Sequence, residues 1–205
     1  MRTILIATSN ESKFKEIKSV FEDYGITNIC SLKDIMPVDE PEEDGDTCQQ
    51  NAFIKASYYA DKFPEYIVLA DDSGIFIEDL NWEPGVYAAR WGGAHNTEEI
   101  RQKLVKELQQ HNISKSNAYY ECAMVLIDNE REVTITEIEA VKGLICDKPS
   151  GPATNKLAYY PYFYINENET LADIKYSDEE RFNKISHRGM TTRKMLNAII
   201  NEYYK

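Results

Sequence analysis

The sequence lacks a long apolar run and an excess of basic residues, and each absence excludes a class of protein. No apolar stretch approaches the ~20 residues that a membrane-spanning helix needs, so we expect no membrane partner. The chain carries 23 Lys and Arg against 35 Asp and Glu, a formal charge of −12. A protein that binds a nucleic acid polymer needs a basic face, so this balance argues against such a partner. A small phosphorylated ligand needs only a few local positive groups and is not excluded.

The sequence also has few cysteines, and none of them is closely spaced. The four are Cys30, Cys48, Cys122 and Cys146. Without Cys-x-x-Cys spacing, zinc and redox motifs are disfavoured. The N-terminal MRTILIATSN has one basic residue and a short apolar stretch, which is unlike a secretory signal. We therefore expect free thiols and a cytoplasmic location.

What the sequence does contain is an alternation of strand and helix patterns. The expected strands are Thr3–Ala7, Ile26–Leu32, Tyr66–Ala70, Ala118–Ile127, Glu132–Val141 and Tyr159–Ile165. The expected helices are one that ends at Gly25, one capped by Thr47, Thr97–Gln110 and Met190–Tyr204. The two long strands before residue 142 predict a hairpin. This order predicts an α/β fold with a mixed β-sheet and flanking helices, in which residues 1–205 form a single domain with two lobes.

The polar run TSNESK, residues 8–13, lies between the first strand and the first helix. Unpaired N–H groups and the positive dipole end of a helix N-terminus attract anions. Thr8, Ser9 and Asn10 can donate to phosphate oxygens, and Lys13 adds a full charge. The run has no glycine cradle and is not a P-loop. An ordinary turn capped by Ser9 or Asn10 is the alternative.

Two adjacent aspartates, Asp71 and Asp72, follow an apolar strand and precede Ser73 and Gly74. Mg²⁺ prefers carboxylate oxygens, waters and substrate phosphates as ligands. The same pair could orient or deprotonate a water nucleophile. A polar turn is an equal alternative, since Asp-Asp-Ser-Gly is good turn chemistry.

Two further segments carry weaker signals. The acidic stretch with Glu42 and Glu43 can supply another metal carboxylate, or it can be a solvated loop. Ser186 is a candidate N-cap for the last helix, which puts His187 and Arg188 in its first turn. Positive charge is unfavourable there unless an anion lies opposite. A surface pair without function is the alternative.

Taken together and in order, four segments resemble the inosine triphosphate pyrophosphatase family, which hydrolyses non-standard purine nucleoside triphosphates. The segments are ATSNESKFKEI, EEDGDTCQQNAFIKA, ADDSGIFIEDLNWEPGVYAARWGG and ISHRGM. They resemble the family's Thr-x-Asn-x-x-Lys, Glu-Glu-x-Gly-x-Thr, Ala-Asp-Asp-Ser-Gly and Ser-His-Arg motifs. These matches span nearly the whole chain.

The resemblance implies an elongated fold with a central substrate cleft and a homodimer. It also implies Mg²⁺-dependent cleavage of a nucleoside triphosphate to the monophosphate and pyrophosphate. Asp72 is then the expected general base and a metal ligand, with Asp71 supporting it. Glu43 is the expected second metal ligand, and Glu42 is the adjacent alternative. The expected substrate contacts at the matching motifs are Thr8, Ser9, Asn10, Lys13, Ser73, His187 and Arg188.

The chain departs from the family where the purine is read. The family segment Gly-Phe-Gly-Tyr-Asp-Pro-x-Phe corresponds to KLAYYPYF, in which Leu157 replaces the stacking Phe and Tyr160 replaces the Asp. Phe182 replaces a substrate lysine, and Arg181 beside it is a candidate substitute. Another aromatic of the same stretch, such as Tyr159, is a candidate for stacking on the base. Because a tyrosine hydroxyl can donate where a carboxylate only accepts, we predict a shifted or relaxed base preference.

Two other classes of function are weighed against the enzyme. One is a non-catalytic nucleotide sensor on the same fold, which would bind ligand without releasing pyrophosphate. The other is a structural or interaction protein that kept only the fold. The adjacent aspartates favour the enzyme, because binding alone does not require a base.

Overall fold

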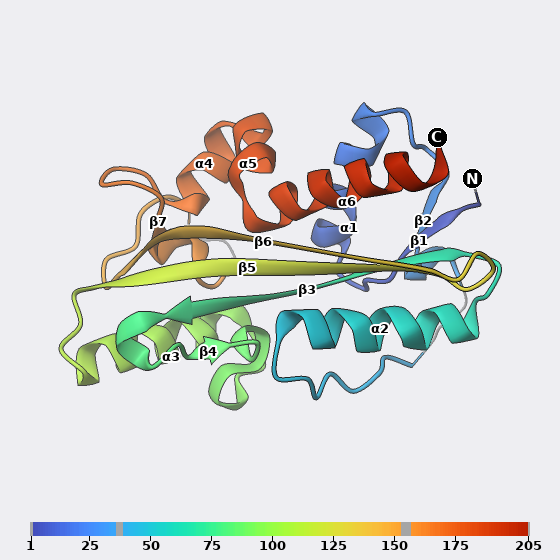
Figure 1. Ribbon diagram of the computed structural model, residues 1–205. Helices are drawn as coiled ribbons and strands as arrows, with labels where there is room; N and C mark the ends of the chain where they lie inside the picture. Colours follow the sequence, from blue (N-terminus) through green and yellow to red (C-terminus); the bar gives the residue numbers. More distant parts are fainter. Residues whose placement is uncertain (1, 36–38, 153–156, 205) are drawn as a thin grey trace. The chain divides into compact units, whose positions relative to one another are not determined.

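The computed structural model describes residues 2–35, 39–152 and 157–204. In these residues the strands form one mixed sheet with the order β2-β1-β3-β5-β6-β7, and β4 pairs with β3 (Figure 1). Helices flank the sheet, so the predicted α/β class with a mixed sheet is confirmed. No helix in this described part of the chain has the length and apolar character to span a bilayer.

The elements alternate along the chain much as the hydrophobic pattern predicts. The strands are β1 (Ile4–Ile6), β2 (Ile29–Ser31), β3 (Ile67–Ile77), β4 (Pro84–Gly85), β5 (Lys115–Asp128), β6 (Val133–Cys146) and β7 (Phe163–Tyr164). The α-helices are α1 (Glu11–Asp23), α2 (Cys48–Lys62), α3 (Thr97–Gln110), α4 (Leu171–Ser177), α5 (Glu179–Ile185) and α6 (His187–Tyr203). The 3₁₀-helices are η1 (Leu32–Asp34), η2 (Glu78–Leu80), η3 (Ala88–Gly93) and η4 (Tyr160–Tyr162).

The chain is divided into two compact units. Unit 1 comprises Met1–Ser73, Cys122–Glu139 and His187–Lys205. Unit 2 comprises Gly74–Glu121 and Ala140–Ser186. Residues of β3, β5 and β6 belong to both. That residues 1–205 act as a single domain with two lobes stays a prediction.

Unit 1 is built on short parallel strands that are apolar on both faces. β1 pairs in parallel with β2 and with β3. Ile4, Ile6 and Leu69 face a buried cluster that α1 and α6 complete, while Leu5 and Val68 are buried on the other face. Figure 1 shows α2 on the side of the strands opposite α1 and α6. Burial on both faces explains why these strands are continuous apolar runs.

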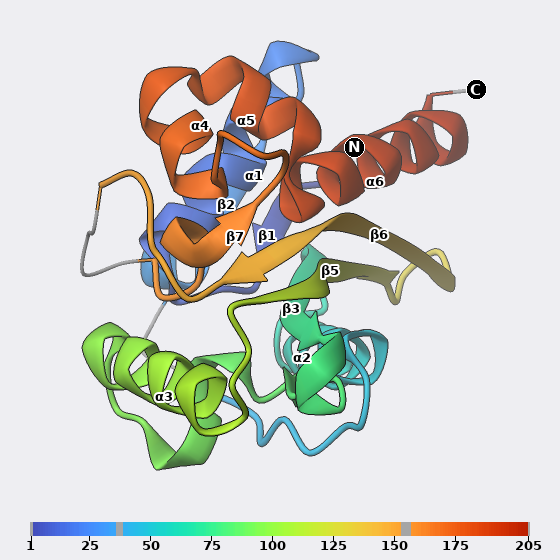
Figure 2. The same ribbon diagram turned by 90° about the vertical axis from the view of Figure 1, so that its left-hand side faces the viewer.

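Unit 2 has a core rich in aromatic rings. Trp91, Tyr120, Tyr159 and Phe163 are buried there together with apolar residues of α3 and α4. The Tyr120 ring meets the Tyr159 and Phe163 rings edge-on, with centroids 6.4 and 5.7 Å apart. Figure 2 shows α3 and the chain of α4, α5 and β7 that make up much of this unit. Edge-on ring contacts of this kind add to the free energy gained from burial.

One strand prediction is wrong in a way that matters for the site. The apolar run Tyr66–Ala70 was expected to end at the aspartates, where a polar turn was one of two equal alternatives, but β3 continues through them to Ile77. Gly74 lies in this strand, and a Cβ there would stand 2.6 Å from the Gly85 carbonyl oxygen. β4 can therefore approach closely only because residue 74 is glycine, and the polar run is extended rather than turned.

The aromatic stretch near residue 160 also differs from its prediction. The sequence suggested an extended run over Tyr159–Ile165, whereas Tyr160–Tyr162 form η4 and only Phe163–Tyr164 form a strand. Pro161 lies inside this segment, and its missing N–H and fixed φ favour a helical turn over a strand interior. The two short helices α4 and α5 were not predicted, because each spans only about two turns of periodic pattern.

Candidate active site

The N-terminus of α1 presents the polar run predicted to bind phosphate. Asn10 is the N-cap, and its side-chain oxygen accepts from the N–H groups of Ser12 and Lys13 at 2.9 and 3.3 Å. The Thr8 hydroxyl accepts from the Asn10 N–H at 3.2 Å. Ser9 and Asn10 are exposed, so the start of the helix is open to an anion. The alternative prediction, that Asn10 caps the helix, is thus confirmed. The exposed cap leaves the N-terminus of α1 accessible.

Asp71 is buried among cations of unit 1. One of its carboxylate oxygens, Oδ2, lies 3.2 Å from the Lys13 ammonium and accepts from Arg188 Nε at 3.1 Å. Its other oxygen, Oδ1, is buried and accepts no hydrogen bond from any residue in the described ranges. Burial alone raises the pKa of Asp71, but Lys13, Arg188 and Lys55 outweigh it and hold that pKa well below its usual value. Asp71 therefore stays ionised.

Asp72 faces a different environment because successive side chains of a strand alternate. Its Oδ2 accepts from the Asn51 side-chain amide of α2 at 3.3 Å. Burial raises the pKa of Asp72, Lys55 and Lys13 lower it, and the charges of Glu43 and Asp71 raise it again. The net pKa is above the ordinary value. The two neighbours in sequence thus have pKa values shifted in opposite directions, which is typical of groups that divide acid and base roles.

Lys55 and Glu43 lie beside this aspartate pair. The Lys55 ammonium is 3.0 Å from the Glu43 carboxylate and donates to the Asp71 carbonyl oxygen at 3.1 Å. Burial lowers the pKa of Lys55, but Asp71, Glu43 and Asp72 outweigh that effect and raise it. A charged Lys55 therefore sits among three carboxylates. No three His, Cys, Asp or Glu side chains of the described residues are grouped as a ready-made metal cage.

His187 and Arg188 of the Ser-His-Arg motif open α6 in unit 1. His187 and Arg188 are buried, so the alternative of a surface pair is wrong. The Arg188 guanidinium donates to Asp71, to the Ser73 hydroxyl at 3.0 Å and to Glu16 of α1 at 3.4 Å. Carboxylates therefore lie opposite the cation at this helix start, as the dipole argument requires.

The predicted base-reading residues lie in unit 2. Tyr159 and Tyr160 are buried in the aromatic core, and the Tyr159 hydroxyl donates to the Ala88 carbonyl at 2.8 Å. The Tyr160 ring contacts the Phe182 ring at a centroid distance of 5.8 Å. Leu157 is partly buried against the same core. Of the three positions that depart from the family, Tyr160 and Phe182 are thus neighbours in space.

Arg181, the candidate substitute for the family lysine, is engaged elsewhere in unit 2. Both of its terminal nitrogens donate to the Glu169 carboxylate at 2.9 Å, in a bidentate ion pair. That pairing lowers the pKa of Glu169 to about 2. A different cation, Lys175, lies 4.2 Å from the centre of the Phe182 ring.

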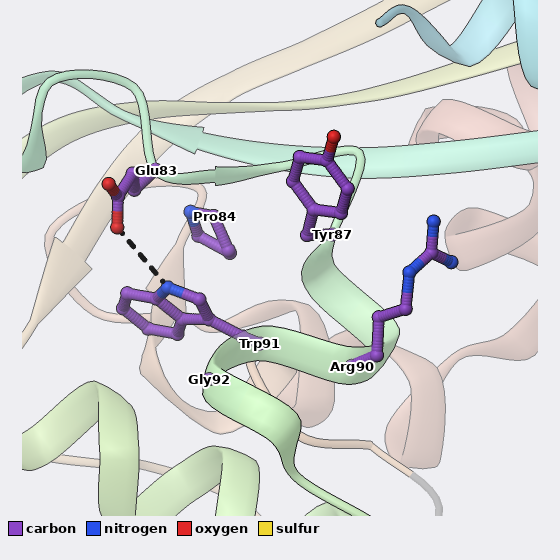
Figure 3. Close-up of a pocket in the computed structure, with 6 residues that line it drawn as sticks. All are labelled: Glu83, Pro84, Tyr87, Arg90, Trp91 and Gly92. Atoms are coloured by element: carbon purple, nitrogen blue, oxygen red, sulfur yellow. Dashed lines mark hydrogen bonds between the residues drawn. The ribbon is translucent and has the colours of Figure 1, made fainter. Parts of the chain in front are cut away.

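Unit 2 also contains a cavity of about 400 Å³. It is lined by Glu83, Pro84, Tyr87, Arg90, Trp91 and Gly92 (Figure 3). Pro84 lies in β4 directly after Glu83, Tyr87 caps η3, and the other three lie in η3. Figure 3 shows the Trp91 indole pointing toward Glu83, to which it donates at 3.4 Å. None of the residues predicted for substrate or metal lines this cavity.

Three polar residues of the site were not singled out from the sequence. Asn51, Lys55 and Glu16 all fall in segments that match the family, but no role was assigned to any of them. Asn51 and Lys55 are four residues apart on α2, which places them on the same helix face. Polar residues at that spacing along an otherwise apolar face were the signal that could have identified them.

Comparison with known proteins places the whole chain among relatives of one kind. The family model described as Ham1 family matches residues 4–198. A dITP/XTP pyrophosphatase of Caldanaerobacter subterraneus subsp. tengcongensis is 38% identical over 202 residues, which is 98% of this chain and 97% of that protein. A dITP/XTP pyrophosphatase of Bacillus licheniformis is 35% identical and covers 98% of this chain and 100% of its own length.

Solved structures agree with the sequence comparison. A HAM1 protein from Coxiella burnetii matches with a TM-score of 0.84 at 29% identity, over 98% of this chain and 100% of that one. The Staphylococcus aureus Ham1 protein matches with a TM-score of 0.82 at 28% identity and the same coverage.

Proposed function

The chain belongs to the Ham1 family, and from this premise we propose that it is a nucleoside triphosphate pyrophosphatase. The proposed reaction is hydrolysis of non-standard purine nucleoside triphosphates to the monophosphate and pyrophosphate, which removes such nucleotides from the cellular pool. This proposal is supported by relatives that are named dITP/XTP pyrophosphatase and that align with nearly the full length of the chain. The observation that carries it is the Asp71–Asp72 pair, in which Asp71 contacts Lys13 and Arg188 while Asp72 contacts the Asn51 amide.

In this proposal Asp72 is the general base. It accepts a proton from the water that attacks the α-phosphorus, and its raised pKa improves it as a proton acceptor. The Asn51 amide donates to one carboxylate oxygen and so fixes the orientation of the group. Asp71 stays ionised and holds Lys13 and Arg188 by ion pairs.

The triphosphate is bound by the open end of α1 and by nearby cations. Thr8, Ser9 and Asn10 offer hydroxyl and amide donors, and Lys13 adds positive charge. The charged Lys55 next to the aspartate pair stabilises negative charge that develops on the leaving pyrophosphate. An acidic protein thus gathers its positive groups locally where a polyanion must bind.

The residues present fit a Mg²⁺ ion. The carboxylates of Glu43 and Asp72 are close enough for the charge of Glu43 to raise the pKa of Asp72, and such oxygen pairs suit a hard cation. Mg²⁺ is usually held by one or two carboxylates together with substrate phosphates, so a site without three protein ligands agrees with this ion. When bound, Mg²⁺ polarises the phosphoryl oxygens and neutralises their charge. Glu42 remains the alternative to Glu43.

We further propose that the base preference is shifted or relaxed relative to the family. The replaced Asp and Lys are here Tyr160 and Phe182, whose rings contact one another within the core of unit 2. The replacements remove two charges and leave the Tyr160 hydroxyl, which can donate as well as accept, and hydrogen-bond discrimination between bases depends on such polar groups.

The remaining assignments are proposals of the same kind. Contacts to the sugar, base or phosphates are proposed for Ser73, Leu157, Tyr159, Tyr160, Arg181, His187 and Arg188. We propose a homodimer in the cytoplasm that binds neither a membrane nor a nucleic acid polymer.

The test is pyrophosphate release from a panel of ITP, XTP, dITP, GTP, ATP and pyrimidine triphosphates, with and without Mg²⁺. Mg²⁺-dependent release of pyrophosphate supports the enzyme. Tight nucleotide binding without release would instead indicate a sensor. A preference confined to ITP and XTP would support the enzyme and contradict the shifted base preference.

A further inference from the structure

A buried glutamate in α1 has no place in the mechanism so far. Glu16 is 8% exposed, although a glutamate is almost never buried unless it is paired. It lies three residues after Lys13, so the two side chains share one face of the helix. That face is the one that meets Asp71, through Lys13.

The partner of Glu16 is the Arg188 guanidinium, and both side chains are only 6% exposed. Arg188 uses a different nitrogen for each of three contacts in unit 1. Nη1 donates to Glu16, Nε donates to Asp71 and Nη2 donates to Ser73. The planar fork of a guanidinium fixes these three directions relative to one another.

The residues that Arg188 holds on β3 are the two neighbours of Asp72. Asp71 and Ser73 point to the same face of the strand, and Asp72 points to the opposite face, where it meets Asn51. The Arg188 side chain thus contacts the residue before the proposed base and the residue after it. Any rotation of this segment that moved Asp72 would stretch at least one of the two hydrogen bonds.

Charge balance explains why a glutamate is needed. Lys13 and Arg188 are two cations, and Asp71 and Glu16 are two anions. Without the Glu16 charge, the buried Arg188 and the partly exposed Lys13 would both pair with Asp71. The guanidinium would then shift toward Asp71 and release Ser73.

We propose that Glu16 is a positioning residue, which holds the Arg188 guanidinium across Asp71 and Ser73 and so fixes the strand segment that presents Asp72. The inference rests on the proposed function, in which Asp72 acts as the base. It assigns Glu16 no contact with substrate.

The first test is steady-state kinetics of Glu16→Gln, which keeps the size of the side chain and removes its charge. We expect kcat to fall about 10-fold or more, since small displacements of a reacting group are costly, and we expect any rise in KM, through the proposed substrate contacts of Arg188 and Ser73, to be smaller than the fall in kcat. Glu22→Gln is the matched control: it is the same substitution in α1, at an exposed glutamate that pairs with Lys18. It should leave both constants unchanged.

The second test does not need activity. Amide hydrogen exchange, read by mass spectrometry, should rise in Glu16→Gln within the β3 peptide that covers residues 71–73. Exchange in α3 should stay as in the wild type, and Glu22→Gln should change neither segment. If Glu16→Gln does not fold, Glu16→Asp replaces it, because it keeps the charge and shortens the reach by one methylene; the same changes are expected in smaller size.

Three results would overturn the inference: an unchanged kcat in a folded variant, a loss expressed mainly in KM, or exchange that rises equally in β3 and α3. The second would mean that the glutamate acts through substrate binding, and the third that it only stabilises the fold. If the wild type releases no pyrophosphate, the proposed function fails, and the exchange measurement alone still decides whether Glu16 fixes the segment.

Discussion

Asp71 and Asp72 are identical in chemistry and adjacent in sequence, yet their pKa values are shifted in opposite directions. Because side chains alternate along β3, Asp71 faces Lys13 and Arg188, whereas Asp72 faces Asn51. The positive charges near Asp72 offset its burial less than those near Asp71 do. The pKa of the first is therefore lowered and that of the second raised. In a strand, successive side chains point to opposite faces, so two adjacent aspartates lie in different environments without any further change of the backbone.

The first prediction concerns catalysis by Asp72. In Asp72→Asn the amide keeps the shape of the side chain but cannot take a proton, so kcat should fall by roughly 10²–10⁴-fold. Pyrophosphate release measures the fall, and calorimetry should show that the variant still binds nucleotide. The control is Asp61→Asn, at an exposed position of α2. A variant with more than half of the wild-type rate would remove Asp72 from the role of base.

The second prediction concerns stability of the same variant without divalent cations. Because the folded-state pKa of Asp72 is raised, its contribution favours folding at pH values below the unfolded pKa and is lost as the pH rises through the folded pKa. At pH 7 the charged group is therefore a cost that Asn removes.

Thermal unfolding in a chelator should accordingly give a higher Tm for Asp72→Asn than for the wild type at pH 7. The difference should shrink as the pH approaches about 4, the range of an ordinary carboxylate. An equal or lower Tm at pH 7 would mean that neighbouring cations compensate the burial of Asp72.

At the scale of elements, α2 matters because it carries two side chains to the site. Asn51 and Lys55 lie one turn apart near its start, and Gly45 before the helix donates to the Asn51 side-chain oxygen at 2.8 Å. The position of the helix start thus sets where both side chains reach. Thr47 fixes that start, since its hydroxyl accepts from the Gln50 N–H at 3.1 Å.

The third prediction is that Thr47→Ala lowers the free energy of unfolding by about 1 kcal/mol, the usual loss when an N-cap is removed. Thr47→Ser keeps the hydroxyl and should lose much less. Chemical denaturation followed by circular dichroism measures both. Equal losses in the two variants would show that the threonine methyl group, rather than the cap, is what stabilises this helix.

At the scale of the whole molecule, we expect the formal charge of −12 to weaken binding to nucleic acid polymers. We expect the acidic surface to repel a polyanion with many phosphates, whereas a single nucleotide, bound as proposed, meets the cations near the aspartate pair. In that proposal the net charge separates monomeric nucleotides from polymers without any specific contact.

The fourth prediction is that duplex DNA does not bind at physiological salt. Non-specific DNA-binding proteins have Kd values of about 10⁻⁴–10⁻⁶ M under such conditions, so fluorescence anisotropy with the chain at ~10⁻⁴ M is a sufficient test. Nucleotide binding by the same sample is the control for an intact site. A salt-dependent rise in anisotropy with DNA would reveal a basic face that the net charge conceals.

The sequence by itself determined the elements whose signals are local. The helix Thr97–Gln110 was predicted with the bounds it has, because its apolar residues recur at spacing four. The long hairpin of β5 and β6 followed from two apolar runs joined by polar residues. The motif segments likewise indicated the family, since their order along the chain needs no coordinates.

Only the tertiary structure decided which residues of the candidate site contact one another. Arg188 holds Asp71 across 117 positions of sequence, and Glu16 holds Arg188 across 172. No periodicity links residues so far apart, so neither the continuation of β3 through the aspartates nor their opposite pKa shifts could be read locally. Charge and burial at a site are sums over neighbours, and only the folded chain specifies which neighbours those are.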